Sequence, residues 1–167
     1  MKSLILPLFV FIVSAVSAQK IIKIEKASDY STHVIGNDFE GVIFSATYNG
    51  SSLIKDKNLK YTPTEINVIE VEKLIASNMN IIKYKDNQNL FIYKHLKKYL
   101  RQYFGYINEK GQKVIYINCF WNDPINKNGR GWLKYNIRVF DGGKCFWSVK
   151  INLITHEVFD FYINGEA

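Results

Sequence analysis

The stretch FGYINEKGQKVIYINCFW, residues 104–121, decides the fold. Apolar and polar residues follow a period of two at residues 106–107 and again over 113–121, which is the spacing of a half-buried strand. Between these runs stands Asn108-Glu109-Lys110-Gly111, whose glycine can adopt a left-handed conformation. The stretch therefore predicts two antiparallel strands joined by a hairpin-like turn.

The same period continues toward the C-terminus. Apolar and polar residues alternate over residues 133–139, and again over 145–153 after the turn Asp141-Gly142-Gly143. A last strand is expected over residues 158–163. These runs predict an antiparallel meander of about four to five strands, with one buried face and one partly polar face.

Upstream of the meander the period becomes helical. Thr62 is placed to cap a helix, with Pro63 at the first helical position and Glu65 completing a capping box. The expected helix runs to about Ser77, and its apolar residues recur at three- and four-residue spacings, as in a face packed on a sheet. The residues of that face are Val68, Val71, Leu74, Ile75 and Met79.

A second helix is predicted over residues 90–103. Its apolar stripe consists of Ile92, Leu96, Tyr99, Leu100 and Tyr103, and its other side carries Lys94, Lys97, Lys98 and Arg101. Such a basic face either attracts anionic head groups or is an ordinary solvated surface.

Strands are also expected near the N-terminus, over residues 20–26 and 41–48. The whole pattern predicts an α+β fold in which two helices pack on one face of an antiparallel sheet, with one or two extra N-terminal strands.

The first 18 residues have the pattern of a cleavable secretory signal peptide. Lys2 gives a basic start, residues 4–13 are apolar, and Val16-Ser17-Ala18 is the small-x-small pattern cut by signal peptidase. A spanning helix would need about 20 apolar residues, so a transmembrane anchor is not expected. We expect a single domain over residues 19–167, secreted or periplasmic.

The chain is basic, with 22 lysine and arginine residues against 15 aspartate and glutamate residues. This charge favours weak, salt-sensitive attraction to an anionic, glycan or protein partner without naming one. We do not expect a nucleic-acid partner.

Two cysteines, Cys119 and Cys145, would enter an oxidising compartment, which favours a disulfide. If residues 133–139 form a strand, however, the two cysteines lie on strands that are not neighbours and exceed the roughly 7 Å reach of a disulfide between Cα atoms. The alternative is two buried thiols in phase with the apolar positions of their strands.

Three runs carry a resemblance: YTPTEINVIEVEKL, YLRQYFGYINEKGQKVIYINCFW and VFDGGKCFWSVKINLITHEVFDFYINGEA. They resemble an uncharacterised family of small exported bacterial proteins. The order of helix and meander also resembles cystatin-like folds, at the level of the fold only. The resemblance implies no activity, catalytic residue or cofactor.

No catalytic, cofactor or metal-binding motif is found in the sequence. His33, His95 and His156 are scattered without metal-ligand spacing, and no pattern typical of a serine or cysteine nucleophile or of a phosphate-binding loop is present. We therefore assign no catalytic, cofactor or metal residue.

The candidate contact site is the loop NDPINKNGRG, residues 122–131, the longest non-periodic stretch in the second half. Its charged residues and the tryptophans at its ends could meet an anionic or glycan ligand through charge and stacking, or the tryptophans could merely anchor its ends. The candidate residues are Trp121, Lys127, Arg130 and Trp132.

Two classes of function fit this sequence. The first is a non-catalytic binding or interaction module, and the second is a small secreted hydrolase-like enzyme whose residues meet only in the fold. A pocket lined by Asp, Glu and His with shifted pKa values would favour the enzyme, and a basic, aromatic surface would favour binding.

Overall fold

The computed structural model describes residues 19–50, 59–82, 87–123 and 128–165, with the side chains of residues 79–88 excepted. The leader expected over residues 1–18 and the candidate contact Lys127 lie outside this range. Within the described part of the chain, none of the helices is long and apolar enough to cross a membrane.

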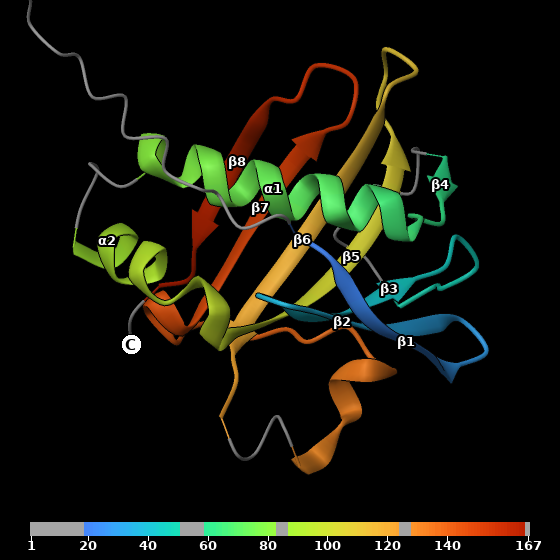
Figure 1. Cartoon of the computed structure of the whole chain (residues 1–167), viewed down its shortest axis with the longest axis horizontal. Coiled ribbons are helices and arrows are strands. Elements are labelled where there is room, and N and C mark those ends of the chain that lie inside the picture. Colours follow the sequence, from blue (N-terminus) through green and yellow to red (C-terminus); the bar gives the residue numbers. More distant parts are fainter. Residues whose placement is uncertain (1–18, 51–58, 83–86, 124–127, 166–167) are drawn as a thin grey trace, which may run out of the picture.

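The described chain forms one eight-stranded sheet and two helices (Figure 1). The strands are β1 (Ile21–Ser28), β2 (Ser31–Gly36), β3 (Glu40–Phe44), β4 (Lys60–Tyr61), β5 (Tyr99–Ile107), β6 (Lys113–Trp121), β7 (Phe146–Asn152) and β8 (Val158–Ile163). The helices are α1 (Glu65–Ile82) and α2 (Asn87–Lys94). The strand order is β1-β2-β3-β5-β6-β7-β8, and the short β4 pairs with β5.

All neighbouring strands are antiparallel except β3 and β5, which run parallel. Parallel neighbours need a long crossover, and here the crossover contains both helices. The α+β class expected from the sequence is confirmed. The number of strands is larger than expected, because the N-terminal part supplies four of them, including β2, which the sequence pattern did not reveal.

The hairpin formed by β5 and β6 confirms the expectation for residues 106–121. Tyr99 pairs with Trp121 at one end of the ladder and Ile107 with Lys113 at the other. In the turn, Gly111 has a positive φ of 75°, and Asn108 Oδ1 accepts backbone N–H groups of Lys110 and Gln112. The glycine and the asparagine together close the turn.

Helix α1 begins two residues later than the sequence pattern predicts. Thr64 Oγ1 accepts the N–H of Asn67, and Asn67 Oδ1 accepts the N–H of Thr64, which makes a reciprocal cap. The predicted cap, Thr62, instead accepts the N–H of Ala46 and ties the helix approach to the chain after β3. The helix ends at Ile82 rather than near Ser77.

The predicted helix over residues 90–103 is wrong in its second half. Helix α2 ends at Lys94, a short 3-10 turn follows at Leu96–Lys98, and β5 begins at Tyr99. Every residue from Tyr99 to Tyr106 is buried, because both faces of this central strand are covered. A strand buried on both faces is apolar without alternation, so its residues happened to match helical spacing.

The predicted strand over residues 133–139 is also wrong. A 3-10 turn at Gly131–Leu133 is followed by an irregular segment, and β6 pairs directly with β7. Cys119 on β6 and Cys145, just before β7, are therefore not separated by another strand, so the argument from strand separation no longer applies. Both cysteines are free, and burial raises the pKa of the Cys119 thiol.

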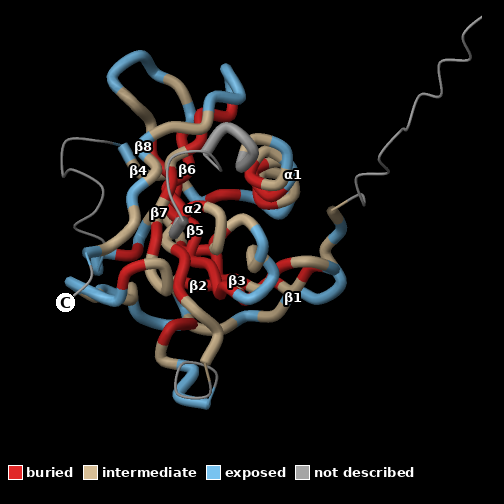
Figure 2. Tube along the Cα trace, turned by 90° about the vertical axis from the view of Figure 1, so that its left-hand side faces the viewer, coloured by how far each residue is buried: buried red, intermediate tan, exposed pale blue. Residues whose placement is uncertain are grey.

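The sheet has a core on each face. Helices α1 and α2 cover one face, called the helix face, where Val68, Val71, Ile75 and Ile92 pack on the strands. The opposite face, called the strap face, holds a second cluster that includes Phe44, Phe104 and Phe120. Figure 2 shows the buried residues concentrated along the central strands of the sheet.

A buried ion pair joins α1 to the sheet inside the helix-face core. Arg101 Nε lies 2.8 Å from Glu72 Oε1, and the Tyr103 hydroxyl donates to the same oxygen at 2.8 Å. The side chains of Glu72 and Arg101 are only 3 % and 2 % exposed. Arg101 also donates to the carbonyl oxygens of Tyr99 and Leu96. Burial raises the pKa of Glu72, while Arg101 and Tyr103 act against that rise.

Both outer strands of the sheet have irregular pairing. The register of β1 against β2 shifts between Ile21 and Lys23 and again between Lys26 and Ser28. The register of β7 against β8 shifts between Ser148 and Lys150, opposite Asp160, which has a positive φ of 49°. Such bulges bend a strand and increase its local twist.

Candidate functional site

Residues 130–141 form an irregular segment, called the strap, that runs across the strap face of the sheet. Its main anchor is Gln102 of β5, which is completely buried. Gln102 Nε2 donates to the carbonyl oxygens of Trp132 and Tyr135, each at 2.7 Å, and Gln102 Oε1 accepts the N–H of Ile137 at 2.9 Å. One strand side chain therefore holds three backbone groups of the strap.

Other side chains hold the rest of the strap. Ser31 donates to the carbonyl of Leu133, the Tyr48 hydroxyl accepts the N–H of Asn136, and Asn118 donates to the carbonyl of Ile137. At its far end, Asn164 donates to the carbonyls of Val139 and Asp141. Side chains of the strands and of residues that follow them thus hold the strap, which forms no strand ladder.

The strap and strands β6 to β8 enclose a groove of about 510 Å³, called the strap groove. This volume is within the range of roughly 300–1,000 Å³ that is usual for ligand pockets. Its lining is Tyr116, Asn118, Ile137, Arg138, Val139, Phe140, Phe146, Ser148, Lys150, Asp160, Tyr162 and Asn164. Two of the aromatic side chains in this lining are largely exposed to solvent: Phe140 is 98 % exposed and Tyr162 is 61 % exposed.

The polar groups of the strap groove are arranged unevenly. Lys150 Nζ pairs with Asp160 Oδ2 at 2.8 Å. Arg138 is exposed on the strap and lies close enough to Tyr116 to lower the pKa of its phenol, against the larger rise caused by burial. The groove therefore has two cationic lining residues and one anionic one.

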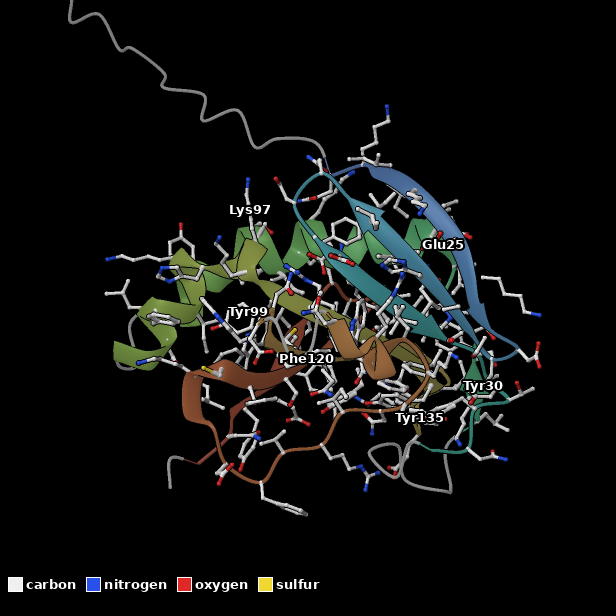
Figure 3. All side chains as sticks on the ribbon, turned by 90° about the horizontal axis from the view of Figure 1, so that it is seen from below. Glu25, Tyr30, Lys97, Tyr99, Phe120 and Tyr135 are labelled. Atoms are coloured by element: carbon white, nitrogen blue, oxygen red, sulfur yellow. The ribbon has the colours of Figure 1, made fainter. Side chains whose placement is uncertain are left out.

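A second, smaller pocket of about 280 Å³, called the histidine pocket, lies over β1 to β3 at the start of the strap. His33 of β2 forms its floor and is 4 % exposed. Its Nδ1 lies 2.9 Å from Glu25 Oε1 and its Nε2 lies 3.0 Å from Glu40 Oε1. Figure 3 shows Glu25 on β1 beside this part of the sheet.

The geometry of the histidine pocket selects the charged form of His33. A neutral imidazole has one N–H group, so only the imidazolium can donate to both carboxylates. Burial opposes the charge, but Glu40 and Glu25 more than offset it, so the pKa of His33 is raised. Hydrogen bonds from Lys23 and His33 lower the pKa of Glu25 to about 2.

This arrangement has limited catalytic use. An imidazolium whose two nitrogens both donate to carboxylates has no free basic nitrogen for a general base. The lining of the pocket contains no serine, threonine or cysteine. Among the described residues, no group of three or more His, Cys, Asp or Glu side chains is placed to hold a metal ion.

The structure separates the residues of the predicted contact loop. Arg130 and Trp132 do come together, both lining the histidine pocket: Arg130 Nη2 lies 3.6 Å from Glu25 Oε1, and the Trp132 ring stands edge-on to His33 at 5.6 Å. Trp121 lies on the helix face, among Tyr99, Phe91 and His95. Lys127 is outside the described residues.

The sequence interpretation missed the strap groove altogether. Its residues come from β6, β7, β8 and the strap, each of which contributes a few side chains. The available signal was polar: Gln102 and Asn118 interrupt otherwise apolar strands, and they pair with each other across β5 and β6. Buried amides need partners, so these two residues indicated that a segment would cover this face.

The charged state of His33 makes stability depend on pH. Its folded pKa is above the unfolded value, so its stabilisation is complete below the unfolded pKa near 6.5 and is lost as pH rises through the folded pKa. We expect His33→Gln to destabilise the protein by about 1.5–3 kcal/mol at low pH, the value of a hydrogen bond to a charged group, and by less at high pH.

Urea unfolding of both proteins between about pH 5.5 and pH 9 measures this difference, since the range brackets the ordinary histidine pKa. His156→Gln is the control, because His156 is exposed and pairs with Glu70 at the surface. A difference between wild type and His33→Gln that stays constant across the range would contradict an imidazolium at this position.

No protein-family model matches the chain, and comparison with curated proteins and with solved structures found no match. Function must therefore be argued from the site itself.

Proposed function

We propose that this protein is an exported, non-catalytic binding module that takes a ligand with a flat apolar part in the strap groove. The observation that carries the proposal is the pair of exposed rings, Phe140 and Tyr162, which line the strap groove of about 510 Å³. Large apolar side chains that are exposed singly are ordinary, but exposed rings gathered at one groove are typical of a binding site.

The support under the groove favours the same function. Its floor consists of paired strands, and its wall is the strap, which is fixed by Gln102, Asn118 and Asn164. Binding residues are often placed on loops that a rigid sheet positions. The basic and aromatic character of the groove is the one expected of a binding surface rather than of an acid-base site.

The alternative function, a hydrolase-like enzyme, is best matched by the histidine pocket. That pocket does combine His33, two glutamates and shifted pKa values. However, both nitrogens of His33 are engaged with carboxylates, and the lining offers no hydroxyl or thiol nucleophile. These contacts favour a structural role, in which His33 ties β1 and β3 to β2.

Export is the part of the proposal that rests on the sequence alone, on the leader pattern of residues 1–18. N-terminal sequencing of the protein recovered from outside the cytoplasm should find Gln19 at or near the start. Recovery only from the cytoplasm, with Met1 retained, would contradict export.

The groove can be tested with a neutral aromatic fluorophore, N-phenyl-1-naphthylamine. We expect saturable binding to the wild type and a loss of about fivefold in affinity for Tyr162→Ala, because the ring supplies a flat apolar contact. Tyr135→Ala is the matched control, since Tyr135 is 62 % exposed, lies on the strap and does not line the groove. Equal affinities for the two variants would place the fluorophore elsewhere and overturn the groove as the binding site.

A further inference from the structure

We infer that the ligand of the strap groove is a small amphipathic anion: an apolar or aromatic body that lies against the rings, with a carboxylate, sulfonate or phosphate group held by Arg138. This inference rests on the proposed function and specifies the chemistry of its ligand.

The charges point to an anion. Asp160, the one acidic lining residue, already has its partner in Lys150 at 2.8 Å. Arg138 adds a second cation on the strap, on the same side as the Tyr116 phenol whose pKa it lowers. An anionic group near Arg138 therefore meets a net positive lining, and a cationic ligand would meet repulsion.

Arg138 can serve a ligand while it contacts the protein. Arg138 already has an interaction within the molecule. A guanidinium carries five N–H donors in a planar fork, which matches the two oxygens of a carboxylate or the oxygens of a phosphate or sulfonate. Arg138 is exposed on the strap and lines the groove.

The amides of the groove argue against a neutral sugar. A neutral glycan is recognised through many hydrogen bonds to its hydroxyl groups, and asparagine side chains are suited to such bonds. Here both N–H groups of Asn118 are used, by Gln102 Oε1 and the Ile137 carbonyl. Both N–H groups of Asn164 are used as well, by the carbonyls of Val139 and Asp141. The amide N–H groups of Asn118 and Asn164 are therefore occupied in holding the strap.

The aromatic rings supply the other half of the recognition. Phe140 comes from the strap, Phe146 from β7 and Tyr162 from β8, and all three line the groove. Flat rings placed in this way bury an apolar ligand body, while the charge at Arg138 orients it.

The test compares two fluorophores that differ by one charged group. 8-Anilinonaphthalene-1-sulfonate carries a sulfonate, and N-phenyl-1-naphthylamine is the same ring system without it. Full-length mature protein is titrated with each probe, as wild type, as Arg138→Gln and as Lys134→Gln. Lys134 is the control because it is exposed on the same strap and does not line the groove, so its substitution removes the same charge.

We expect the sulfonate probe to bind the wild type more tightly than the neutral probe does. Arg138→Gln should weaken the sulfonate probe by about fivefold, the size of one exposed charge contact, and leave the neutral probe unchanged. Raising the salt from about 0.05 M to about 0.5 M should weaken the sulfonate probe only, because the charge contact is screened. Lys134→Gln should change neither affinity.

The remaining outcomes show whether the anionic ligand or the strap groove itself is the proposal that fails. Equal binding of both probes, with no effect of Arg138→Gln, would overturn the anionic ligand and leave the groove intact as a binding site. Equal weakening of both probes by Arg138→Gln would show that Arg138 supports the strap rather than the anion, and would also overturn the inference. Failure of both probes to bind in the groove would overturn the proposed function itself.

Discussion

Replacing Glu72 by alanine should lower the free energy of unfolding by about 3–5 kcal/mol, the cost of removing one partner of a buried ion pair. Glu72 and Arg101 are almost fully buried and 2.8 Å apart, and the Tyr103 hydroxyl donates to the same carboxylate. Without Glu72, the Arg101 charge stays inside the helix-face core with only two carbonyl groups to receive it. Urea unfolding followed by circular dichroism measures the loss.

The matched control is Glu70→Ala on the same helix. Glu70 is 32 % exposed and pairs with His156 at the surface, so its loss should cost less than about 1 kcal/mol. The double variant Glu72→Leu with Arg101→Met should be more stable than Glu72→Ala alone, because it removes both charges from the core. Similar losses for Glu70→Ala and Glu72→Ala would show that the buried pair has no special role.

The second large effect is expected at Gln102. Gln102→Leu keeps the volume of the side chain but removes every hydrogen bond through which β5 holds the strap. Each buried polar group left without a partner costs about 1–3 kcal/mol, and some of them will find water once the strap loosens. We expect a total loss of about 3 kcal/mol in the free energy of unfolding and weaker binding of both fluorophores.

Asn118→Ala gives the graded comparison for the strap. Asn118 donates to one strap carbonyl, that of Ile137, so its loss should destabilise the protein less than the loss of Gln102 does. Hydrogen exchange of the Ile137 amide is the local measurement, because Gln102 Oε1 accepts that N–H. Unchanged protection of this amide in Gln102→Leu would contradict the role of Gln102 as the anchor.

The parts of the fold that were predicted from sequence are those with a local chemical signal. The hairpin of β5 and β6 has alternating strands and a turn with Asn108 and Gly111, and β8 was placed at residues 158–163, where the structure has it. Helix α1 was predicted from its periodic apolar face, with the cap misplaced by two residues. The turn residues mark the hairpin, and α1 and β8 each have a partly exposed face, so the period of these two elements is visible.

The sequence predictions failed in two situations. In one, a strand is buried on both faces, so apolar and polar residues do not alternate along it. In the other, side chains form the hydrogen bonds that the backbone of a neighbouring strand would otherwise form. Strand β5 is covered on both faces, so residues 99–103 matched a helix by spacing alone. Residues 133–139 alternate like a strand, but Gln102 and Asn118 take the backbone groups that a neighbouring strand would have paired. Only tertiary contacts distinguish these cases.

None of the residues that line the strap groove was among the predicted contacts. The loop pattern indicated Arg130 and Trp132, and these two line one pocket with His33. The strap groove was missed because it exists only once the strap crosses the strands. The clue to this crossing was the pair of amide side chains, Gln102 and Asn118, on neighbouring strands.

The bulges at the two outer strands bear on how the molecule behaves when it is concentrated. A straight outer strand presents a row of unpaired backbone groups that can template a strand from another molecule and so begin a fibril. Here β1 loses its register twice and carries Lys23 and Lys26, and β8 is interrupted at Asp160. Both ends of the sheet are therefore poor templates, which protects an open eight-stranded sheet from growing into an aggregate.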